Sequence, residues 1–147
     1  MKKQKLKYEL LAPAGDFSML SAAVKAGADA VYFGVQEFNM RSGAKNFKIS
    51  DLGKMREICN SSSKKVKMYL TLNTIIYSDE SKSAESLIKR IKRKVDAVIC
   101  WDLSVIELCK KYKIPFHIST QASVANVEAA KFYKKLGAER IVLAREL

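Results

Sequence analysis

The chain contains 147 residues and carries 27 Lys and Arg against 15 Asp and Glu, which gives a formal net charge of +12. A hydrophobic content of 48% excludes a disordered chain, and the length is sufficient for one domain with a buried core. The longest uninterrupted apolar run, residues 97–101, is too short to cross a membrane, so we expect a cytoplasmic protein.

The excess positive charge is spread along the chain and is not concentrated in a tail. The N-terminal 50 residues, the next 50 and the last 47 carry net charges of +4, +5 and +3. The densest basic clusters lie in residues 89–94, 110–113 and 134–135, where we expect helices to end, and cations there complement the helix dipole. The charge alone therefore does not establish nucleic-acid binding.

The cysteines and the histidine predict no metal chemistry within this chain. Cys59, Cys100 and Cys109 are odd in number and contain no Cys-x-x-Cys spacing, so we expect small buried side chains in a reducing compartment. His117 is the only histidine, which excludes a zinc helix of the His-x-x-x-His type. The sequence thus predicts no metal ligand and no cofactor held by this chain.

Short apolar strands alternate with amphipathic helices along the whole chain. We expect strands over residues 9–12, 30–33, 67–72, 97–100, 116–119 and 140–143. Five helices are expected between them, and Asp16, Asp102 and Asn126 are the residues that begin three of these helices. Gly27 and Gly137 occur where two helices end and a left-handed backbone is favoured.

Strict alternation of strands and helices with short connections is typical of a parallel sheet. No strand is followed by a glycine-rich phosphate-binding motif, which weakens the doubly wound nucleotide-binding alternative. Along each strand, one set of alternate residues is apolar and the other turns polar toward the end of the strand, as at Thr71 and Ser119. We therefore predict an α/β fold, an incomplete TIM-type (β/α) barrel with about six parallel strands and five helices, formed by residues 1–147.

Reactive groups of such barrels lie at the C-terminal ends of the strands and in the loops that follow. On this basis the candidate catalytic residues are His117, Ser119 and Glu9. The candidate substrate-binding residues are Asn39, Arg41, Thr71, Asn73, Thr120, Gln121, Arg145 and Glu146. No single motif among them defines a reaction.

Several of these residues have alternative interpretations. His117 and Ser119 are two apart on a strand, roughly 6.5–7 Å along the backbone, which favours a polar pair that orients a ligand over a nucleophile with its base. Arg41 is either a clamp for a carboxylate or phosphate, or a solvated loop cation. For Asp16 and Asp102 we rank the role of helix N-cap first.

Specific strings of residues carry a family resemblance. The chain contains, in this order, ELLAPAGD (9–16), AGADAVYFG (26–34), FNMR (38–41), YLTLNT (69–74), HISTQ (117–121) and RIVLAREL (140–147). Spread over the whole chain, these strings closely resemble peptidase family U32, the collagenase-like peptidases.

The resemblance implies a catalytic domain of the TIM-barrel type. The family is named for collagen-degrading peptidases, and other members are similar to RNA-modifying or quinone-biosynthesis proteins that take part in oxygen insertion, including hydroxylation of the wobble uridine of tRNA. Several relatives hold an iron–sulfur cluster through cysteines downstream of the block that matches residues 145–147. None of the three cysteines here matches a cluster position, so a cluster is expected only in a C-terminal part that this chain lacks.

A closed barrel of this type needs eight strands, and only six are expected here. We therefore expect the N-terminal part of a longer barrel, completed by the missing barrel half or by a partner chain. Three functions stay open: a segment of an enzyme that acts in tRNA wobble-uridine hydroxylation, a true peptidase acting on collagen-like or other peptides, and a non-catalytic partner subunit of a split enzyme. The expected partners are tRNA and the chain that completes the barrel.

Overall fold

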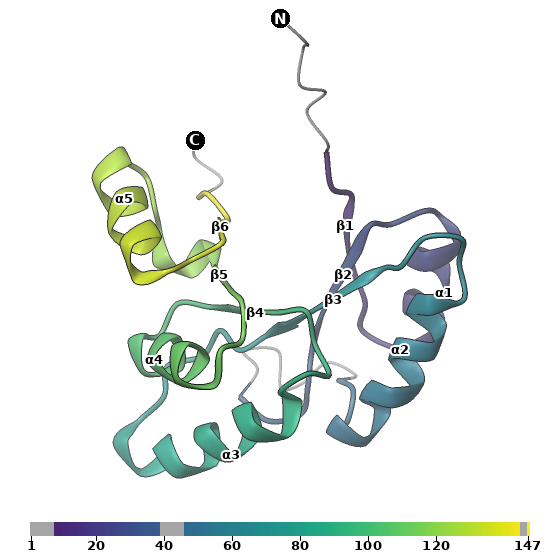
Figure 1. Ribbon diagram of the computed structural model, residues 1–147, viewed down its shortest axis with the longest axis horizontal. Helices are drawn as coiled ribbons and strands as arrows, with labels where there is room; N and C mark the ends of the chain where they lie inside the picture. Colours follow the sequence, from purple (N-terminus) through teal and green to yellow (C-terminus); the bar gives the residue numbers. More distant parts are fainter. Residues whose placement is uncertain (1–7, 39–45, 145–146) are drawn as a thin grey trace, which may run out of the picture.

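The computed structural model describes residues 8–38, 46–144 and 147. Within this part of the chain, six parallel strands form one sheet in the order β1-β2-β3-β4-β5-β6, so each strand lies beside the next one in the sequence. The helices lie around one side of this curved sheet (Figure 1). The resulting α/β half-barrel with five helices confirms the incomplete barrel predicted from the sequence.

The strands are shorter than the helices that connect them. They are β1 (Leu11–Pro13), β2 (Ala30–Gly34), β3 (Lys67–Thr71), β4 (Ala97–Cys100), β5 (Phe116–Ile118) and β6 (Arg140–Ile141). The helices are α1 (Phe17–Lys25), α2 (Leu52–Asn60), α3 (Ser81–Ile91), α4 (Leu103–Tyr112) and α5 (Val127–Leu136). Short 3-10 helices precede three of them: η1 (Ile49–Asp51), η2 (Ser78–Glu80) and η3 (Thr120–Ala122). Across the described segments, no helix is long and apolar enough to pass through a bilayer.

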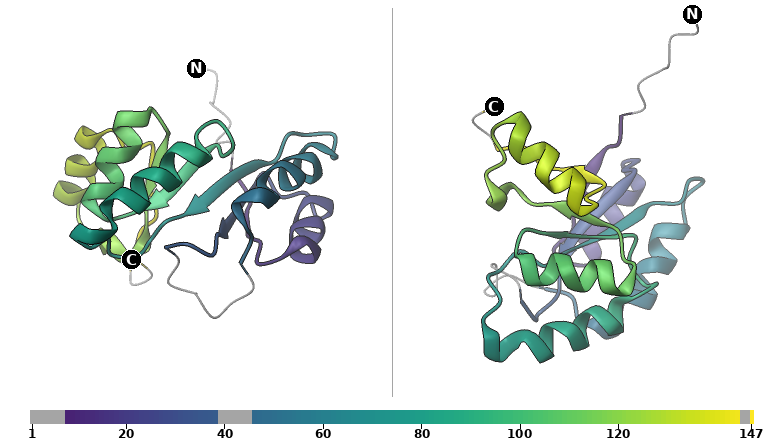
Figure 2. Two further views of the ribbon diagram at one scale, coloured as in Figure 1. Left: turned by 90° about the horizontal axis from the view of Figure 1, so that it is seen from below. Right: turned by 60° about the vertical axis from the view of Figure 1, so that its left-hand side comes forward.

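The helices gather in two groups. Helices α1 and α2 contact each other, as do α3 and α4, and Figure 2 shows the first pair at one end of the sheet and α3, α4 and α5 at the other. The main hydrophobic core lies between the sheet and these helices, and Leu20, Met55 and Leu87 are fully buried in it. This burial of the helices' apolar stripes is what holds the layers together.

A second, smaller apolar cluster lies on the inner face of the sheet, where side chains alternate with those of the main core. Its buried members are Ala30, Tyr69, Ala97 and Ile99. The separation of the two clusters follows from the alternation of side chains along each strand. The inner face is therefore the interior of the barrel, as the sequence pattern indicated.

The expected local signals set the helix ends. Asp16 and Asp102 accept hydrogen bonds from backbone amides of the first turns of α1 and α4 at 2.8 Å, and Asn126 does the same for α5 at 2.9 Å. Gly27 and Gly137 follow α1 and α5 with φ angles of 89° and 102°, a left-handed conformation that glycine adopts without steric cost. These local predictions are confirmed.

Two aspartates, each just before a strand, accept a hydrogen bond from the backbone of the adjacent strand. The Asp29 carboxylate, just before β2, accepts from the Leu10 amide at 2.7 Å, and the Asp96 carboxylate, just before β4, accepts from the Met68 amide at 2.7 Å. In both cases the side chain binds the backbone at the start of the preceding strand. These two aspartates thus help to set the register between neighbouring strands.

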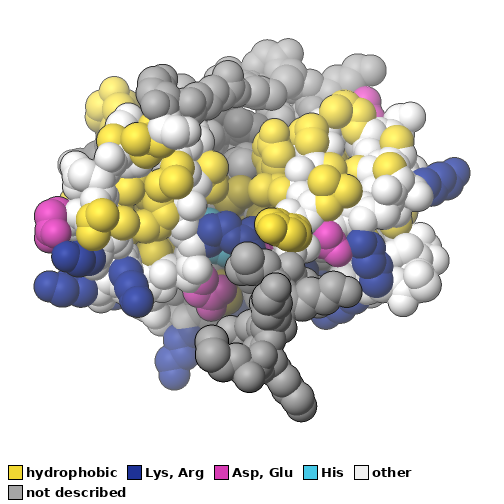
Figure 3. Space-filling model, turned by 90° about the horizontal axis from the view of Figure 1, so that it is seen from above, with side chains coloured by type: hydrophobic (Ala, Val, Ile, Leu, Met, Phe, Trp, Pro, Cys, Tyr) yellow, Lys and Arg dark blue, Asp and Glu magenta, His cyan; other side chains and the backbone are white. Residues whose placement is uncertain are grey.

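The half-barrel has an open side between its first and last strands. Within the described residues, β1 and β6 are each paired on one side only. Apolar side chains on and beside these two edges are 45–65% exposed: Leu10, Met19, Val127, Phe132 and Leu143. Figure 3 looks onto this open side, where hydrophobic areas flank a central group of charged side chains.

Candidate functional site

Hydrogen bonds tie together the loops that follow β3 and β4. The Trp101 indole N–H donates to the Asn73 carbonyl oxygen at 2.9 Å. The Asp102 carboxylate, which begins α4, also accepts from the Ile76 amide at 3.1 Å. These contacts connect two neighbouring loops at the C-terminal edge of the sheet and preorganise the side chains there.

The loop after β5 contributes further polar groups to the same edge. The buried Ser119 hydroxyl hydrogen-bonds the Gln121 side-chain oxygen, while Thr120 and Gln121 are exposed in η3. The Thr71 hydroxyl, at the end of β3, donates to the Phe33 carbonyl at 2.9 Å. The Ser119 hydroxyl therefore donates to Gln121, and no hydrogen bond between Ser119 and His117 is present among the described residues.

Asn73 carries an acceptor that the described residues leave unused. Its side-chain Oδ1 is buried and has no hydrogen-bond partner among them. An unpaired acceptor away from water costs about 1–3 kcal/mol. Asn73 thus carries a buried acceptor without a partner among the described residues, in the same residue whose carbonyl oxygen binds the Trp101 indole.

His117 lies on the inner face of β5, in register with Ile99 of β4 and Arg140 of β6. Its ring is 4% exposed and packs edge-on against Tyr69, with the ring centroids 4.7 Å apart. Burial, and then the positive charge of Arg140, lower the pKa of His117 to about 4. At neutral pH the imidazole is thus uncharged, with one N–H donor and one acceptor nitrogen.

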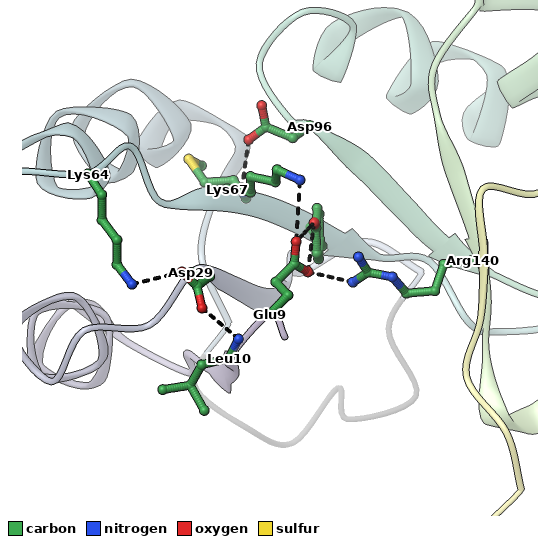
Figure 4. Close-up of polar contacts among 9 residues, drawn as sticks. Glu9, Leu10, Asp29, Lys64, Lys67, Asp96 and Arg140 are labelled. Atoms are coloured by element: carbon green, nitrogen blue, oxygen red, sulfur yellow. Dashed lines mark hydrogen bonds and ion pairs between the residues drawn. The ribbon is translucent and has the colours of Figure 1, made fainter. Parts of the chain in front are cut away.

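Glu9 is the centre of a charged network in the barrel interior (Figure 4). Its carboxylate accepts from the Arg140 guanidinium at 2.5 Å and from the Tyr69 hydroxyl at 3.0 and 3.1 Å, and the Lys67 ammonium lies 3.3 Å away. The hydrogen bond from Arg140, followed by those from Tyr69 and Lys67, outweighs burial and lowers the pKa of Glu9 to about 2. The network joins the two edges of the sheet and reaches His117 through Tyr69.

The position of Glu9 differs from the one expected for a site residue. Glu9 was grouped with residues at the C-terminal ends of the strands, although it is the first residue of the expected strand 9–12, and β1 itself begins only at Leu11. Glu9 therefore lies at the N-terminal end of the sheet, together with Lys67 and Arg140, the first residues of β3 and β6. In barrels of this type the C-terminal end carries the reacting groups and the N-terminal end mainly supports stability.

The structure places five of the other predicted residues at one edge. Thr71, Asn73, Ser119, Thr120 and Gln121 all lie at or just beyond the C-terminal ends of β3 and β5. Asn39, Arg41, Arg145 and Glu146 lie outside the described residues. The sequence interpretation missed the partners of Glu9, although charged residues at inward positions of apolar strands were the available signal.

The model of peptidase family U32 matches residues 15–147, nearly the whole chain. The chain belongs to peptidase family U32. This membership confirms the resemblance carried by the residue strings, and it accords with the half-barrel.

Relatives of this U32 chain have different names. The chain is 42% identical over 142 residues to a collagenase of Porphyromonas gingivalis, 38% over 143 residues to tRNA hydroxylation protein P1 of Bacillus subtilis, and 39% over 140 residues to the 23S rRNA 5-hydroxycytidine C2501 synthase of Escherichia coli. Each alignment covers 95% of this chain but only 34%, 33% and 21% of the respective relative. The U32 chain thus spans about a third or less of the length of these proteins.

Among solved structures, phosphonopyruvate hydrolase in complex with oxalate and Mg²⁺ superposes on the U32 chain with a TM-score of 0.63. The alignment covers 95% of this chain and 59% of that chain, at 13% sequence identity. At such low identity the likeness shows the shared fold alone.

The cysteines of this U32 chain do not fit an iron–sulfur cluster. Cys59, Cys100 and Cys109 are all buried in the core between the sheet and the helices, and burial raises the pKa of the Cys59 thiol. Thiolate ligands need the opposite environment. No group of three His, Cys, Asp or Glu within residues 8–38 and 46–144 is arranged to hold a metal ion.

Proposed function

We propose that this chain forms the N-terminal barrel segment of a U32 enzyme that hydroxylates RNA, with the wobble uridine of tRNA as its substrate and the cytoplasm as its location. The observation that carries the proposal is the 38% identity to tRNA hydroxylation protein P1 across 95% of the chain. The 39% identity to the rRNA 5-hydroxycytidine synthase supports the same type of product on a related base. An iron–sulfur cluster, if the complete enzyme uses one, belongs to residues outside this chain.

The C-terminal edge of the sheet provides groups that suit a flat, polar base. A uracil ring presents two carbonyl acceptors and one N–H donor. In this proposal the Asn73 side-chain oxygen, which has no partner among the described residues, accepts from the N–H, and the Thr120 hydroxyl and Gln121 amide donate to the carbonyls. His117 is the candidate catalytic residue on the inner face, and Glu9 acts on it as a positioning residue through Tyr69.

The decisive experiment is deletion of the gene followed by mass spectrometry of tRNA nucleosides. We expect the hydroxylated wobble uridine to disappear and the wild-type gene to restore it. Genes encoding Asn73→Ala or His117→Ala should restore less than about a tenth of the wild-type amount of the hydroxylated nucleoside. An effect of this size is expected when a buried hydrogen-bonding group is lost. Asn60→Ala, which removes an exposed amide at the end of α2, is the matched control and should restore the nucleoside fully.

Two outcomes would contradict the proposal in different ways. Unchanged tRNA nucleosides in the deletion strain would exclude tRNA hydroxylation. Loss of a hydroxylated rRNA nucleoside with intact tRNA would keep RNA hydroxylation and replace tRNA by rRNA as the substrate.

A peptidase acting on collagen-like or other peptides is the second candidate, supported by the 42% identity to the collagenase of Porphyromonas gingivalis. The geometry favours it less, because the Ser119 hydroxyl binds Gln121 and is not held by His117. Incubation of the full-length protein with gelatin, with and without serine or metal inhibitors, tests this candidate. Absence of cleavage refutes it.

A non-catalytic subunit of a split enzyme is the third candidate. It is motivated by six strands where a closed barrel has eight, and by the exposed apolar side chains beside β1 and β6. We propose that the remaining barrel strands, from a further segment or a partner chain, cover this open side. Native purification that recovers a companion chain supports a subunit, whereas a monodisperse monomer that melts cooperatively contradicts it.

A further inference from the structure

Basic side chains cover the C-terminal ends of α3 and α4. Two short segments contain eight exposed Lys and Arg residues: Lys89, Arg90, Lys92, Arg93, Lys94, Lys110, Lys111 and Lys113. The two helices pack side by side and run in the same direction, since each connects parallel strands (Figure 2). Both segments therefore meet on one surface, here named the basic patch.

Three ammonium groups of the basic patch surround one aromatic ring. The Nζ atoms of Lys89, Lys92 and Lys111 lie 5.7, 5.9 and 5.5 Å from the centre of the Tyr112 ring. Any two of them are therefore at most about 12 Å apart, close to the screening length of roughly 8–10 Å in physiological salt. Their mutual repulsion is only partly screened.

One carboxylate, that of Glu85, interacts with this group of cations. Glu85 accepts from Lys111 at 2.8 Å and from the Tyr112 hydroxyl at 2.5 Å, and lies 3.7 Å from Lys89. The hydrogen bonds from Lys111 and Tyr112 lower the pKa of Glu85 to about 2, so it stays ionised. A single negative charge against three ammonium groups leaves the surface around Tyr112 positive.

The backbone conformation gives independent evidence that two of these cations, Arg93 and Lys113, do not stabilise the fold. Arg93, after α3, and Lys113, after α4, have φ angles of 67° and 56°. Glycine is favoured in this left-handed conformation, and α1 and α5 do end in glycine, at Gly27 and Gly137. A side chain costs roughly 1–2 kcal/mol there. Two positions where glycine would suit the fold are thus occupied by cations.

The helix dipole explains only part of the basic patch. Cations in the last turn of a helix interact favourably with its C-terminal carbonyls, which accounts for Lys89 and Lys110. The effect falls off beyond that turn, and Arg93 and Lys94 lie after the end of α3. No described carboxylate forms an ion pair with Lys92, Arg93, Lys94 or Lys113.

We propose that the basic patch binds the phosphate backbone of the RNA on which the protein acts. The inference rests on the proposed function and adds a second contact surface to it. The patch lies at the opposite ends of α3 and α4 from the C-terminal edge of the sheet, about 15 Å away along helices of 11 and 10 residues. A folded tRNA is large enough to reach both, so the patch positions the RNA without reading its sequence.

The test uses the full chain as cells produce it and a fluorescent, unmodified tRNA transcript, with binding followed by anisotropy between 50 and 300 mM salt. The variant is the double substitution Arg93→Gly and Lys113→Gly. We expect the slope of log affinity against log salt to fall by about 1.5–2, and affinity near 100 mM salt to fall roughly 10- to 100-fold. Its melting temperature should be unchanged or higher, because glycine suits both positions.

The matched control is Lys25→Ala with Lys131→Ala, which removes two exposed charges from α1 and α5. It should leave the salt slope within about 0.5 of the wild type. The inference is overturned if tRNA affinity and its salt slope fall equally in both double variants, or if neither falls in the glycine variant. Absence of tRNA binding by the wild-type protein also overturns the inference about the basic patch. In that case the proposed function survives if the hydroxylated wobble uridine is missing from the deletion strain. Weaker binding by the glycine variant with unchanged nucleosides in the deletion strain would support the patch and refute the proposed function.

Discussion

Glu9→Gln removes the charge at the centre of the network that connects β1 to β6. The pKa of Glu9 is about 2, against an ordinary value of 4.5. At 1.36 kcal/mol per pKa unit, the difference corresponds to roughly 3 kcal/mol of stabilisation of the folded state. The Glu9 and Arg140 side chains are 19% and 38% exposed, so solvent screens part of this interaction. We therefore expect E9Q to lower the free energy of unfolding by about 1–2 kcal/mol at pH 7.

The effect of E9Q depends on pH in a defined direction. Because the folded-state pKa of Glu9 is lowered, its contribution is fully present above about pH 4.5 and is lost as the pH falls through 2. The difference in stability between the wild type and E9Q should thus narrow by roughly half or more between pH 7 and pH 3.

Urea unfolding followed by circular dichroism at pH 7 and pH 3 measures both effects. Glu128→Gln is the control, since Glu128 forms an ion pair with Lys131 at 2.9 Å on the surface of α5 and its side chain is 82% exposed. Glu128→Gln should lower the free energy of unfolding by less than about 0.5 kcal/mol. The reasoning is refuted if E9Q costs no more than this control, or if its cost is the same at both pH values.

Three further predictions concern the same structure. Asp102→Ala removes the N-cap of α4 and a contact to the neighbouring loop, and should lower the free energy of unfolding by about 1–2 kcal/mol in urea titrations; a neutral effect would argue against the cap. Leu87→Ala leaves a void at a fully buried position and should cost about 2–5 kcal/mol, whereas Leu103→Ala, at a 60% exposed position, should cost under about 0.5 kcal/mol. In NMR titrations His117 should show a midpoint near 4, and Arg140→Gln should raise it because a neighbouring positive charge is lost; an unchanged midpoint would contradict this cause. Since that pKa lies below the ordinary 6.5, protonation of His117 should destabilise the fold as the pH falls from 6.5 toward 4.

The fold could be predicted because its signals are local. Alternation of side chains along Lys67–Thr71 and the apolar stripes of the helices depend only on residues near in sequence. The caps at Asp16 and Asp102 likewise involve amides within the next three residues. Each of these predictions is confirmed, since no distant contact overrides them.

The candidate site could be predicted in part. Once the strands are parallel, Asn73 and Ser119 must lie at the same edge of the sheet, because parallel strands end together. Glu9 could not be placed in this way. The expected strand 9–12 begins with Glu9 and β1 begins two residues later, at Leu11, so in both cases Glu9 lies at the N-terminal end of the sheet, away from the C-terminal edge.

The sequence by itself determined the strand–helix alternation, the helix ends and the family, since each is written in short runs of residues. Only the tertiary structure decided that Glu9 meets Arg140, 131 residues away, because the curvature of the sheet brings its two edge strands across from each other. The same holds for the net charge of +12. The positive charges are distributed along the sequence, but in the structure several of them surround Tyr112. This happens because α3 and α4 pack side by side with their C-terminal ends together.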